Sequence, residues 1–233
     1  MSDKKIESVL SIASEKYVEI ISLRASVQVI PYVGGALDTL LSGKGSKIQR
    51  QRIEQMLNNL SERLSKIELA QVIEPTEEFY DLSLSIFDGV AKSRSKEKRE
   101  RFASILVNQV TKEADWDESE MAVRVLASLE DIHIQVLAIA QSAPVCTSPF
   151  DGLKVITLQN KHSRHVGEIT PLCLSTHFSD YSTDHLRLIC SELMSKGLLH
   201  DEGIGRLDTK AMEYFVTTNL ANWFLSWITD ESN

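Results

Sequence analysis

The sequence contains few of the residues that interrupt helices or cross-link chains: five prolines, ten glycines and three cysteines among 233 residues. Low proline and glycine content favours long helices over frequent tight turns. The cysteines (Cys146, Cys173 and Cys190) are widely spaced and odd in number, which argues against a disulfide framework and favours a cytoplasmic protein. No run of about eighteen apolar residues is present, so no transmembrane helix is expected. The polar start of the chain, up to Glu7, does not resemble a secretory leader.

Sequence motifs of the common catalytic chemistries are also missing. The chain has no G-x-S-x-G nucleophile elbow, phosphate-binding P-loop, G-x-G-x-x-G dinucleotide turn or H-E-x-x-H zinc motif. Residues 43–46 (Gly-Lys-Gly-Ser) lack the upstream glycine and apolar strand of a P-loop, so we interpret them as a turn. We therefore expect a non-enzymatic protein without a cofactor. An enzyme with a dispersed active site stays open as a third alternative.

The charge is unevenly distributed along the chain. Residues 1–113 hold 17 lysines and arginines against 16 aspartates and glutamates. Residues 114–233 hold 8 against 17, a net charge of −9. Because contacts to phosphates need clustered lysine and arginine, this acidic half argues against DNA binding.

The first 141 residues predict helices almost throughout. Apolar spacing, capping residues and turn signals place them at 6–29, 36–41, 47–72, 77–90, 96–111, 118–129 and 131–141. The helix at 47–72 carries a heptad-like apolar stripe from Ile48 to Leu69, which fits either an antiparallel helical partner or a coiled-coil dimer. Thr76, and either Ser93 or Ser95, are the expected N-caps of the next two helices.

The C-terminal region predicts a helix, a short strand, a turn, a second strand and a closing helix. Residues 184–196 have helical apolar spacing and end at Gly197, where a left-handed residue is favoured. Residues 214–216 are typical of a strand, and residues 217–219 precede the last helix. That helix is expected to bury Leu220, Phe224, Leu225 and Ile228. This order is the plan of a winged helix-turn-helix with a small β wing.

We therefore expect a mainly α protein of two domains: an α-helical domain over residues 1–128 and a winged-helix-like domain over residues 129–233. Residues 144–152 contain two prolines and are the best candidate for a linker. The sequence does not fix the structure of residues 153–182. Residues near 155–158 could form a short strand, and residues 169–178 could form either a strand or a helix.

One set of side chains has the chemistry of a metal site. His162, His165, Cys173 and His177 lie within sixteen residues, and imidazole and thiolate groups are the usual ligands of tetrahedral zinc. No C-x2-C pair anchors the set, and its spacing matches no standard finger. Metal binding therefore stays the less favoured interpretation, and no metal is assigned.

Two further sets are candidates for macromolecular contacts. The second helix of a helix-turn-helix reads the DNA groove, so His185, Arg187 and Lys196 are the candidate nucleic-acid contacts. Trp223 and Trp227 lie one helical turn apart on the last helix and would mark a partner interface if exposed, or cover the core otherwise.

A run of six basic residues lies between Lys92 and Arg101, interrupted by Glu97 and Glu100. Such a run can bind nucleic acid or anionic lipid. We interpret it as a solvated face because the glutamates interrupt it and it spans a helix start.

Two parts of the chain resemble known bacterial proteins. Residues 30–35 (Ile-Pro-Tyr-Val-Gly-Gly), followed by the amphipathic helix at 48–67, look like a set of uncharacterised bacterial helical proteins. Residues 99–106 and 129–137 are similar to the abortive-infection-alpha type of phage-defence protein, in which a Phe-Ala-x-Leu-Leu helix precedes a Leu-Ser-x-x-Glu-Ala-x-x-Leu helix. The sequence departs from that pattern at 130–133, where the Glu-Ala pair is missing. The resemblance implies a role in phage defence and assigns no catalytic residue.

The sequence thus predicts a non-enzymatic bacterial interaction protein that self-associates and binds a protein partner, with phage defence as its setting. The alternative is a DNA-binding transcriptional regulator of the winged-helix type.

Overall fold

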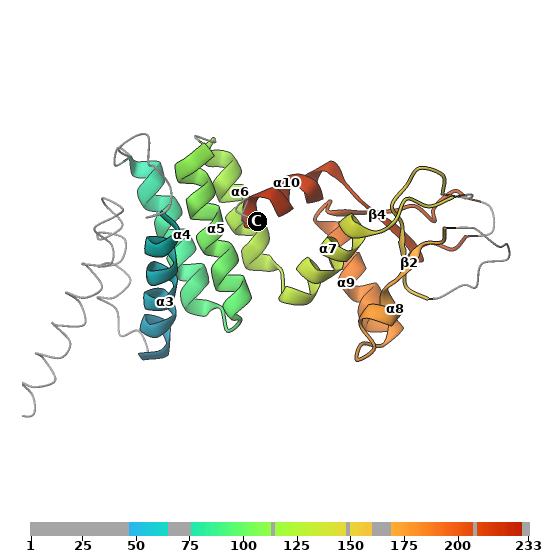
Figure 1. The fold of residues 1–233 in the computed structure, drawn as a ribbon, viewed down its shortest axis with the longest axis horizontal. Coiled ribbons are helices and arrows are strands. Elements are labelled where there is room, and N and C mark those ends of the chain that lie inside the picture. Colours follow the sequence, from blue (N-terminus) through green and yellow to red (C-terminus); the bar gives the residue numbers. More distant parts are fainter. Residues whose placement is uncertain are drawn as a thin grey trace, which may run out of the picture. The chain divides into compact units, whose positions relative to one another are not determined.

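The computed structural model describes residues 47–64, 76–112, 115–147, 150–159, 169–206 and 209–229. Within these ranges the chain forms eight helices and four short strands, so the protein is mainly helical with one small sheet (Figure 1). The helices expected at 6–29 and 36–41, and the segment at 30–35, lie outside the described residues. None of the described helices is long and apolar enough to cross a membrane. The chain divides into two compact units, residues 1–127 and residues 128–233.

The described part of the first unit consists of four helices: α3 (Lys47–Leu64), α4 (Glu77–Lys92), α5 (Lys96–Lys112) and α6 (Trp116–Ser128). Helices α3, α4 and α5 pack against one another in pairs, as neighbouring ribbons in Figure 1. Helix α6 carries Trp116, whose ring meets that of Phe79 edge-on at 6.1 Å between centroids. Fully buried apolar side chains from these helices include Leu82, Ile86, Phe87, Val90, Phe102, Ala103, Ile105, Leu106, Ala122 and Leu126.

The apolar stripe on α3 is used inside the chain. Ile53, Met56, Leu57 and Leu60 are at most 3% exposed, whereas Ile48 near the helix start is 58% exposed. Because the buried four pack in the core that α3 forms with α4 and α5, this part of the stripe has a partner within its own chain. The described part of the stripe therefore gives no support for a coiled-coil dimer, and the rest of the predicted helix, residues 65–72, lies outside the described residues.

Side-chain caps fix where α4 and α5 begin. Thr76 Oγ1 accepts a hydrogen bond from the amide three residues later at 3.2 Å, which confirms it as the N-cap of α4. Ser95 Oγ accepts the equivalent bond at 3.0 Å at the start of α5. Ser93 instead ends α4, where its hydroxyl donates to the carbonyl of Gly89 at 2.7 Å.

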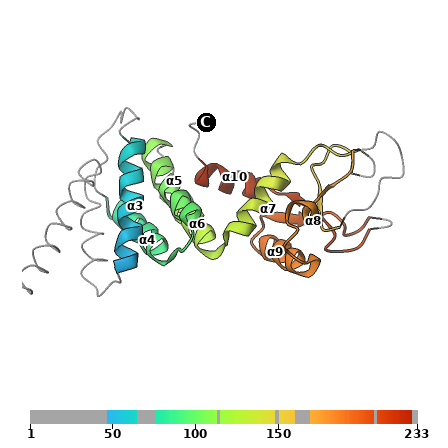
Figure 2. The same cartoon turned by 60° about the horizontal axis from the view of Figure 1, so that its bottom comes forward.

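The described part of the second unit combines four helices with the small sheet (Figure 2). Its elements are α7 (Asp131–Ser142), β1 (Ile156–Thr157), β2 (Leu172–Cys173), α8 (Leu174–His177), α9 (Thr183–Ser195), β3 (Leu199–Asp201), β4 (Tyr214–Thr217) and α10 (Asn219–Ile228). The strand order is β2-β1-β4-β3, with β1 parallel to β2 and the other two pairs antiparallel. Helix α7 packs against α9, α10 and β4, and α9 also packs against β3 and α8. Residues 169–178, undecided in sequence, thus contain a strand followed by a short helix.

The proline-containing segment at 144–152 belongs to the second unit. Cys146 and Phe150 are buried in a cluster with Val155 and Tyr214, against which Leu153 and Val216 pack. The interpretation of this segment as a linker is therefore wrong, because a linker does not bury apolar side chains in a domain core.

Helix α10 begins as the sequence predicts. Thr218 Oγ1 accepts a hydrogen bond from the Ala221 amide at 3.2 Å, which confirms the expected N-cap. Phe224, Leu225 and Ile228 are buried. The prediction that Leu220 is buried is wrong: it lies in the first turn and is 37% exposed.

Candidate interaction surface

Helix α9 is held at both ends by capping bonds. At its start, Ser182 Oγ accepts a hydrogen bond from the amide three residues later, at 3.3 Å. At its end, Gly197 has a φ of 72° and its amide donates to the carbonyl of Met194 at 2.9 Å. The Leu198 amide donates to the carbonyl of Leu193, also at 2.9 Å. These two bonds form a Schellman motif and confirm the prediction of a left-handed residue at Gly197.

One face of α9 is buried and anchors the helix. Leu186, Ile189, Cys190 and Leu193 are all buried in the second unit. Leu186, Ile189 and Leu193 each contribute roughly 1.5–3 kcal/mol to stability, so the position of the helix is strongly determined. Burial also raises the pKa of the Cys190 thiol to about 12, which keeps the thiol protonated and unreactive at neutral pH.

The opposite face of α9 has an apolar centre between two carboxylates. Leu188 is 57% exposed at the centre of this face. Asp184 and Glu192 lie one turn before and one turn after it, with side chains 90% and 50% exposed. The guanidinium of Arg187 donates to Asp184 at 2.6 Å. The α9 surface, defined as Asp184, Leu188 and Glu192, thus presents an exposed leucine with acidic neighbours.

A buried histidine positions one of these carboxylates. His133 on α7 is 4% exposed, and its Nε2 lies 2.6 Å from Oε2 of Glu192. Its Nδ1 accepts a hydrogen bond from the Glu130 amide at 3.2 Å. Because Nδ1 is an acceptor here, the ring hydrogen is on Nε2 and is donated to the Glu192 carboxylate. The side chain of Glu192 is therefore anchored at one oxygen while half of its surface stays exposed.

The candidate nucleic-acid contacts do not form one basic cluster. His185 and Arg187 are exposed near the start of α9, whereas Lys196 is half-buried at its C-cap. Arg187 is already paired with Asp184, and Glu192 lies between Arg187 and Lys196 along the helix. Phosphate contacts need uncompensated positive charge, which this arrangement offers only at scattered points.

The loop between β3 and β4 is held at its base by a buried carboxylate. Asp201 is 1% exposed, and its Oδ1 accepts a hydrogen bond from the Gly203 amide at 2.9 Å. Its Oδ2 accepts one from the Met212 amide at 2.6 Å, at the other arm of the loop. Met212 has a φ of 61°, a left-handed conformation that costs a residue with a side chain about 1–2 kcal/mol. The carboxylate therefore joins both arms and stabilises a strained position.

The outer part of this loop contains an exposed isoleucine and an ion pair between Arg206 and Glu202. Ile204 is 66% exposed. The Arg206 guanidinium forms an ion pair with Glu202 and stacks 4.9 Å from the centroid of the Phe150 ring. Arg206 is thus used in contacts within the unit.

The two tryptophans of α10 differ in exposure. Trp223 is half-buried, Trp227 is 4% exposed, and their rings meet edge-on at 6.3 Å between centroids. Trp227 therefore presents little surface in this structure, and Trp223 presents more.

The candidate metal ligands are only partly described. His162 and His165 lie outside the described residues. Cys173 is buried, with its sulfur 3.1 Å from the Ser175 hydroxyl, and His177 is exposed at the end of α8. In the described part of the chain, no three histidine, cysteine, aspartate or glutamate side chains are grouped as metal ligands.

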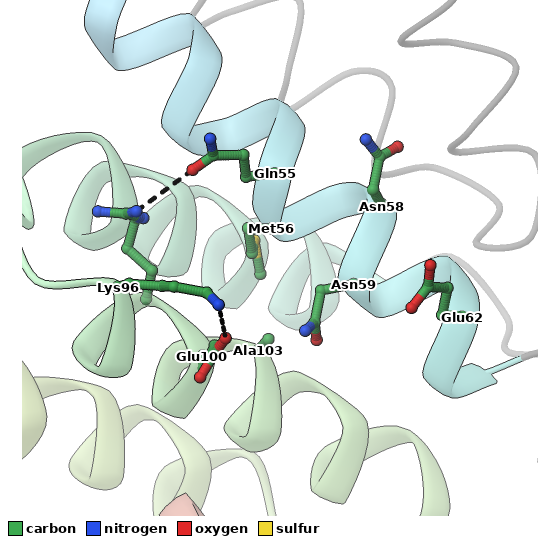
Figure 3. Close-up of a pocket in the computed structure, with 9 residues that line it drawn as sticks. Gln55, Met56, Asn58, Asn59, Glu62, Lys96, Glu100 and Ala103 are labelled. Atoms are coloured by element: carbon green, nitrogen blue, oxygen red, sulfur yellow. Dashed lines mark hydrogen bonds and ion pairs between the residues drawn. The ribbon is translucent and has the colours of Figure 1, made fainter.

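A groove of about 410 Å³ lies between α3 and α5 of the first unit (Figure 3). Its lining residues are Gln55, Met56, Asn58, Asn59, Glu62, Lys96, Arg99, Glu100 and Ala103. Lys96 pairs with Glu100 at 3.5 Å, and Arg99 donates to Gln55 Oε1 at 3.2 Å. With no histidine, cysteine or serine among these lining residues, the groove offers polar contacts but no nucleophile next to a base. Sequence analysis missed it because its two walls are some forty residues apart.

The basic run between Lys92 and Arg101 is largely used within the first unit. Lys92 pairs with Asp88, Lys96 pairs with Glu100, Lys98 donates to the carbonyl of Ala127, and Arg99 donates to the carbonyls of Ser93, Arg94 and Ser95. These contacts support the interpretation of the run as a face of the fold rather than a binding patch.

No family model, curated protein or solved structure matches the chain. Its own geometry is therefore the basis for assigning a function.

Proposed function

We propose that this is a non-enzymatic interaction protein whose second unit is a winged helix-turn-helix that binds a protein partner through the α9 surface. The element order is α7, β1, β2, α8, α9, β3, β4, and it fits that plan with β2 as an added strand, α9 as the second helix of the pair and the β3–β4 loop as the wing. The position of β4 between β1 and β3 supports the same plan.

The observation that carries the proposal is the exposure of Leu188 at the centre of α9. A leucine 57% exposed between two carboxylates fits a protein contact, in which apolar centres with polar rims are typical. DNA would instead bring phosphates close to Asp184 and Glu192, and the repulsion would oppose binding.

The alternative is a DNA-binding regulator that uses His185, Arg187 and Lys196. It is supported by the element order and by the exposure of His185 and Arg187. The charges oppose it, because Arg187 pairs with Asp184 on α9 and Arg206 pairs with Glu202 in the wing. A protein partner is therefore the better proposal.

Affinity purification of the tagged full-length chain from its own organism tests the proposal. The comparison uses the wild type, Leu188→Ser and the control Met121→Ser, which removes an apolar side chain 40% exposed in the first unit. We expect a co-purifying protein whose yield falls at least tenfold with Leu188→Ser and is unchanged with Met121→Ser, a loss of about 1.4 kcal/mol or more. Equal yields from all three chains, or a co-purified nucleic acid that depends on Leu188, would reject it. A second, untagged copy of this chain would identify self-association as the contact.

A role in phage defence is the narrower proposal, and the resemblance of residues 99–106 and 129–137 supports it. Phe102, Ala103, Leu106 and Leu137 within these segments are all buried, so the resemblance concerns packing rather than a site. A phage challenge of cells with and without the gene tests the role. Equal plaque counts would remove the defence role and leave the protein contact standing.

A further inference from the structure

We propose that the partner of the α9 surface is a basic segment of a protein, in which an apolar side chain is flanked by lysine or arginine, and that Glu192 selects it. This inference rests on the proposed function, because it names the chemistry of the partner at the same surface.

The first argument is the spacing of the carboxylates around Leu188. Asp184 and Glu192 are eight residues apart on a helix that rises about 1.5 Å per residue, so their backbones are separated by about 12 Å. A helical partner would match this with cations about eight residues apart, and an extended one with cations about four residues apart, because a strand rises about 3.3 Å per residue. In both cases, an apolar side chain of the partner, placed between its two cations, would contact Leu188.

The second argument is the orientation of Glu192. Its Oε2 accepts the Nε2 hydrogen of the buried His133 at 2.6 Å, while the side chain stays 50% exposed. A carboxylate held in place loses less conformational entropy when it binds a cation than a mobile one does. Asp184 lacks such an anchor, because its one described side-chain partner is the exposed Arg187, whose positive charge already offsets the negative charge of Asp184. Glu192 is therefore the carboxylate with the greater effect on specificity.

The third argument is the surrounding charge. Residues 128–233 contain 7 lysines and arginines against 13 aspartates and glutamates. Glu130 and Asp131 lie at the start of α7, and the Glu130 amide bonds the opposite side of the His133 ring from Glu192. The field of this unit attracts cations and repels acidic partners, which increases the association rate for a basic segment.

Binding of two synthetic peptides to the full-length chain tests the inference. One is a helical peptide of about twelve residues, long enough to span about 18 Å, composed of leucine and lysine; the other has glutamate in place of each lysine. Fluorescence anisotropy gives the affinity for the wild type, Glu192→Gln and the control Glu77→Gln, which removes one exposed carboxylate from the first unit. Glutamine retains an oxygen that can accept the His133 hydrogen bond, so Glu192→Gln is expected to fold normally.

We expect the lysine peptide to bind the wild type, and the glutamate peptide not to bind. Glu192→Gln should weaken binding about tenfold, and Glu77→Gln by less than about twofold, since only the first removes the held carboxylate. Equal losses in the two variants, or binding of the glutamate peptide, would overturn the inference. If Leu188→Ser still loses its co-purified partner in that case, the proposed function stands and only the basic chemistry of the partner is wrong.

Discussion

The imidazole of His133 and the carboxylate of Glu192 lie 2.6 Å apart and join α7 to α9 across 59 positions of sequence. The bond anchors the exposed face of α9 to a buried side chain of the neighbouring helix. The same contact therefore contributes to stability and shapes the proposed binding surface.

The first prediction concerns the stability that His133 provides. His133→Ala should lower the free energy of unfolding by about 2 kcal/mol or more, because it leaves a cavity and removes the acceptor of the Glu130 amide. Urea unfolding followed by circular dichroism measures the change. Gln135→Ala, exposed on the same helix, is the control and should change stability by less than about 0.5 kcal/mol. A loss no larger than that of the control would show that the contact is not structural.

The second prediction concerns the β3–β4 loop. Asp201→Ala should free both arms of the β3–β4 loop, because the Gly203 and Met212 amides lose their acceptor and Met212 can leave its left-handed conformation. Trypsin should then cleave after Arg206 or Lys210 at least tenfold faster, since about 1.4 kcal/mol of local stability corresponds to tenfold more open loop.

Asp201→Asn distinguishes the role of the second oxygen. Its NH2 group would face one of the two backbone amides, so we expect cleavage nearly as fast as with Asp201→Ala. Asp180→Ala, at an exposed carboxylate, should leave cleavage unchanged. Slow cleavage of both Asp201 variants would contradict the assignment of Asp201 as the clamp.

The third prediction follows from the Cys190 thiol, whose pKa is raised from 9.0 to about 12 by burial. The folded chain keeps this proton at pH values at which the unfolded chain has lost it, so stability is full below pH 9 and falls as the pH rises toward 12. Between pH 8 and pH 10 the wild type should lose about 1.4 kcal/mol more than Cys190→Ala. Urea unfolding of both chains at the two pH values measures the difference. Parallel losses would show that the thiol is ionised as easily in the folded chain as in the unfolded one.

The fourth prediction concerns Gly89 on α4. A Cβ built at Gly89 would lie 2.5 Å from the Cζ atom of Phe102, whose ring is fully buried. Gly89→Ala should therefore destabilise the protein by about 1–3 kcal/mol, although alanine is the better helix former. Ser85→Ala, exposed on the same helix, should be neutral or slightly stabilising. A higher melting temperature for Gly89→Ala would contradict the close packing of the two helices.

Local features of the fold could be predicted from the sequence, because each depends on residues a few positions apart. Thr76, Ser95, Thr218 and Gly197 end or begin helices through bonds spanning three to five residues, and the structure confirms all four. The sequence left residues 169–178 undecided between strand and helix, because the helix there has only four residues, Leu174–His177, too few for apolar periodicity to show.

Contacts between distant residues were not predicted. No sequence motif links His133 to Glu192. The sequence around Asp201 likewise does not show that its carboxylate accepts a hydrogen bond from the Met212 amide. The linker interpretation of residues 144–152 was wrong because proline marks both exposed linkers and buried turns. The burial of Cys146 and Phe150 in a core cluster shows that this segment is part of the second unit. The apolar face that the sequence predicts for this helix does not include Leu188, and only the packing of α9 shows that this leucine is exposed.

Photo-crosslinking at position 188 tests the central claim most directly. A photoreactive amino acid replaces Leu188 in the full-length chain inside its own organism, and Gln135 is replaced in a control chain. The account predicts an adduct at position 188 that protease removes and nuclease does not, with little or none at position 135. An adduct that nuclease removes, or equal adducts at both positions, would contradict the assignment of α9 as a protein-binding surface.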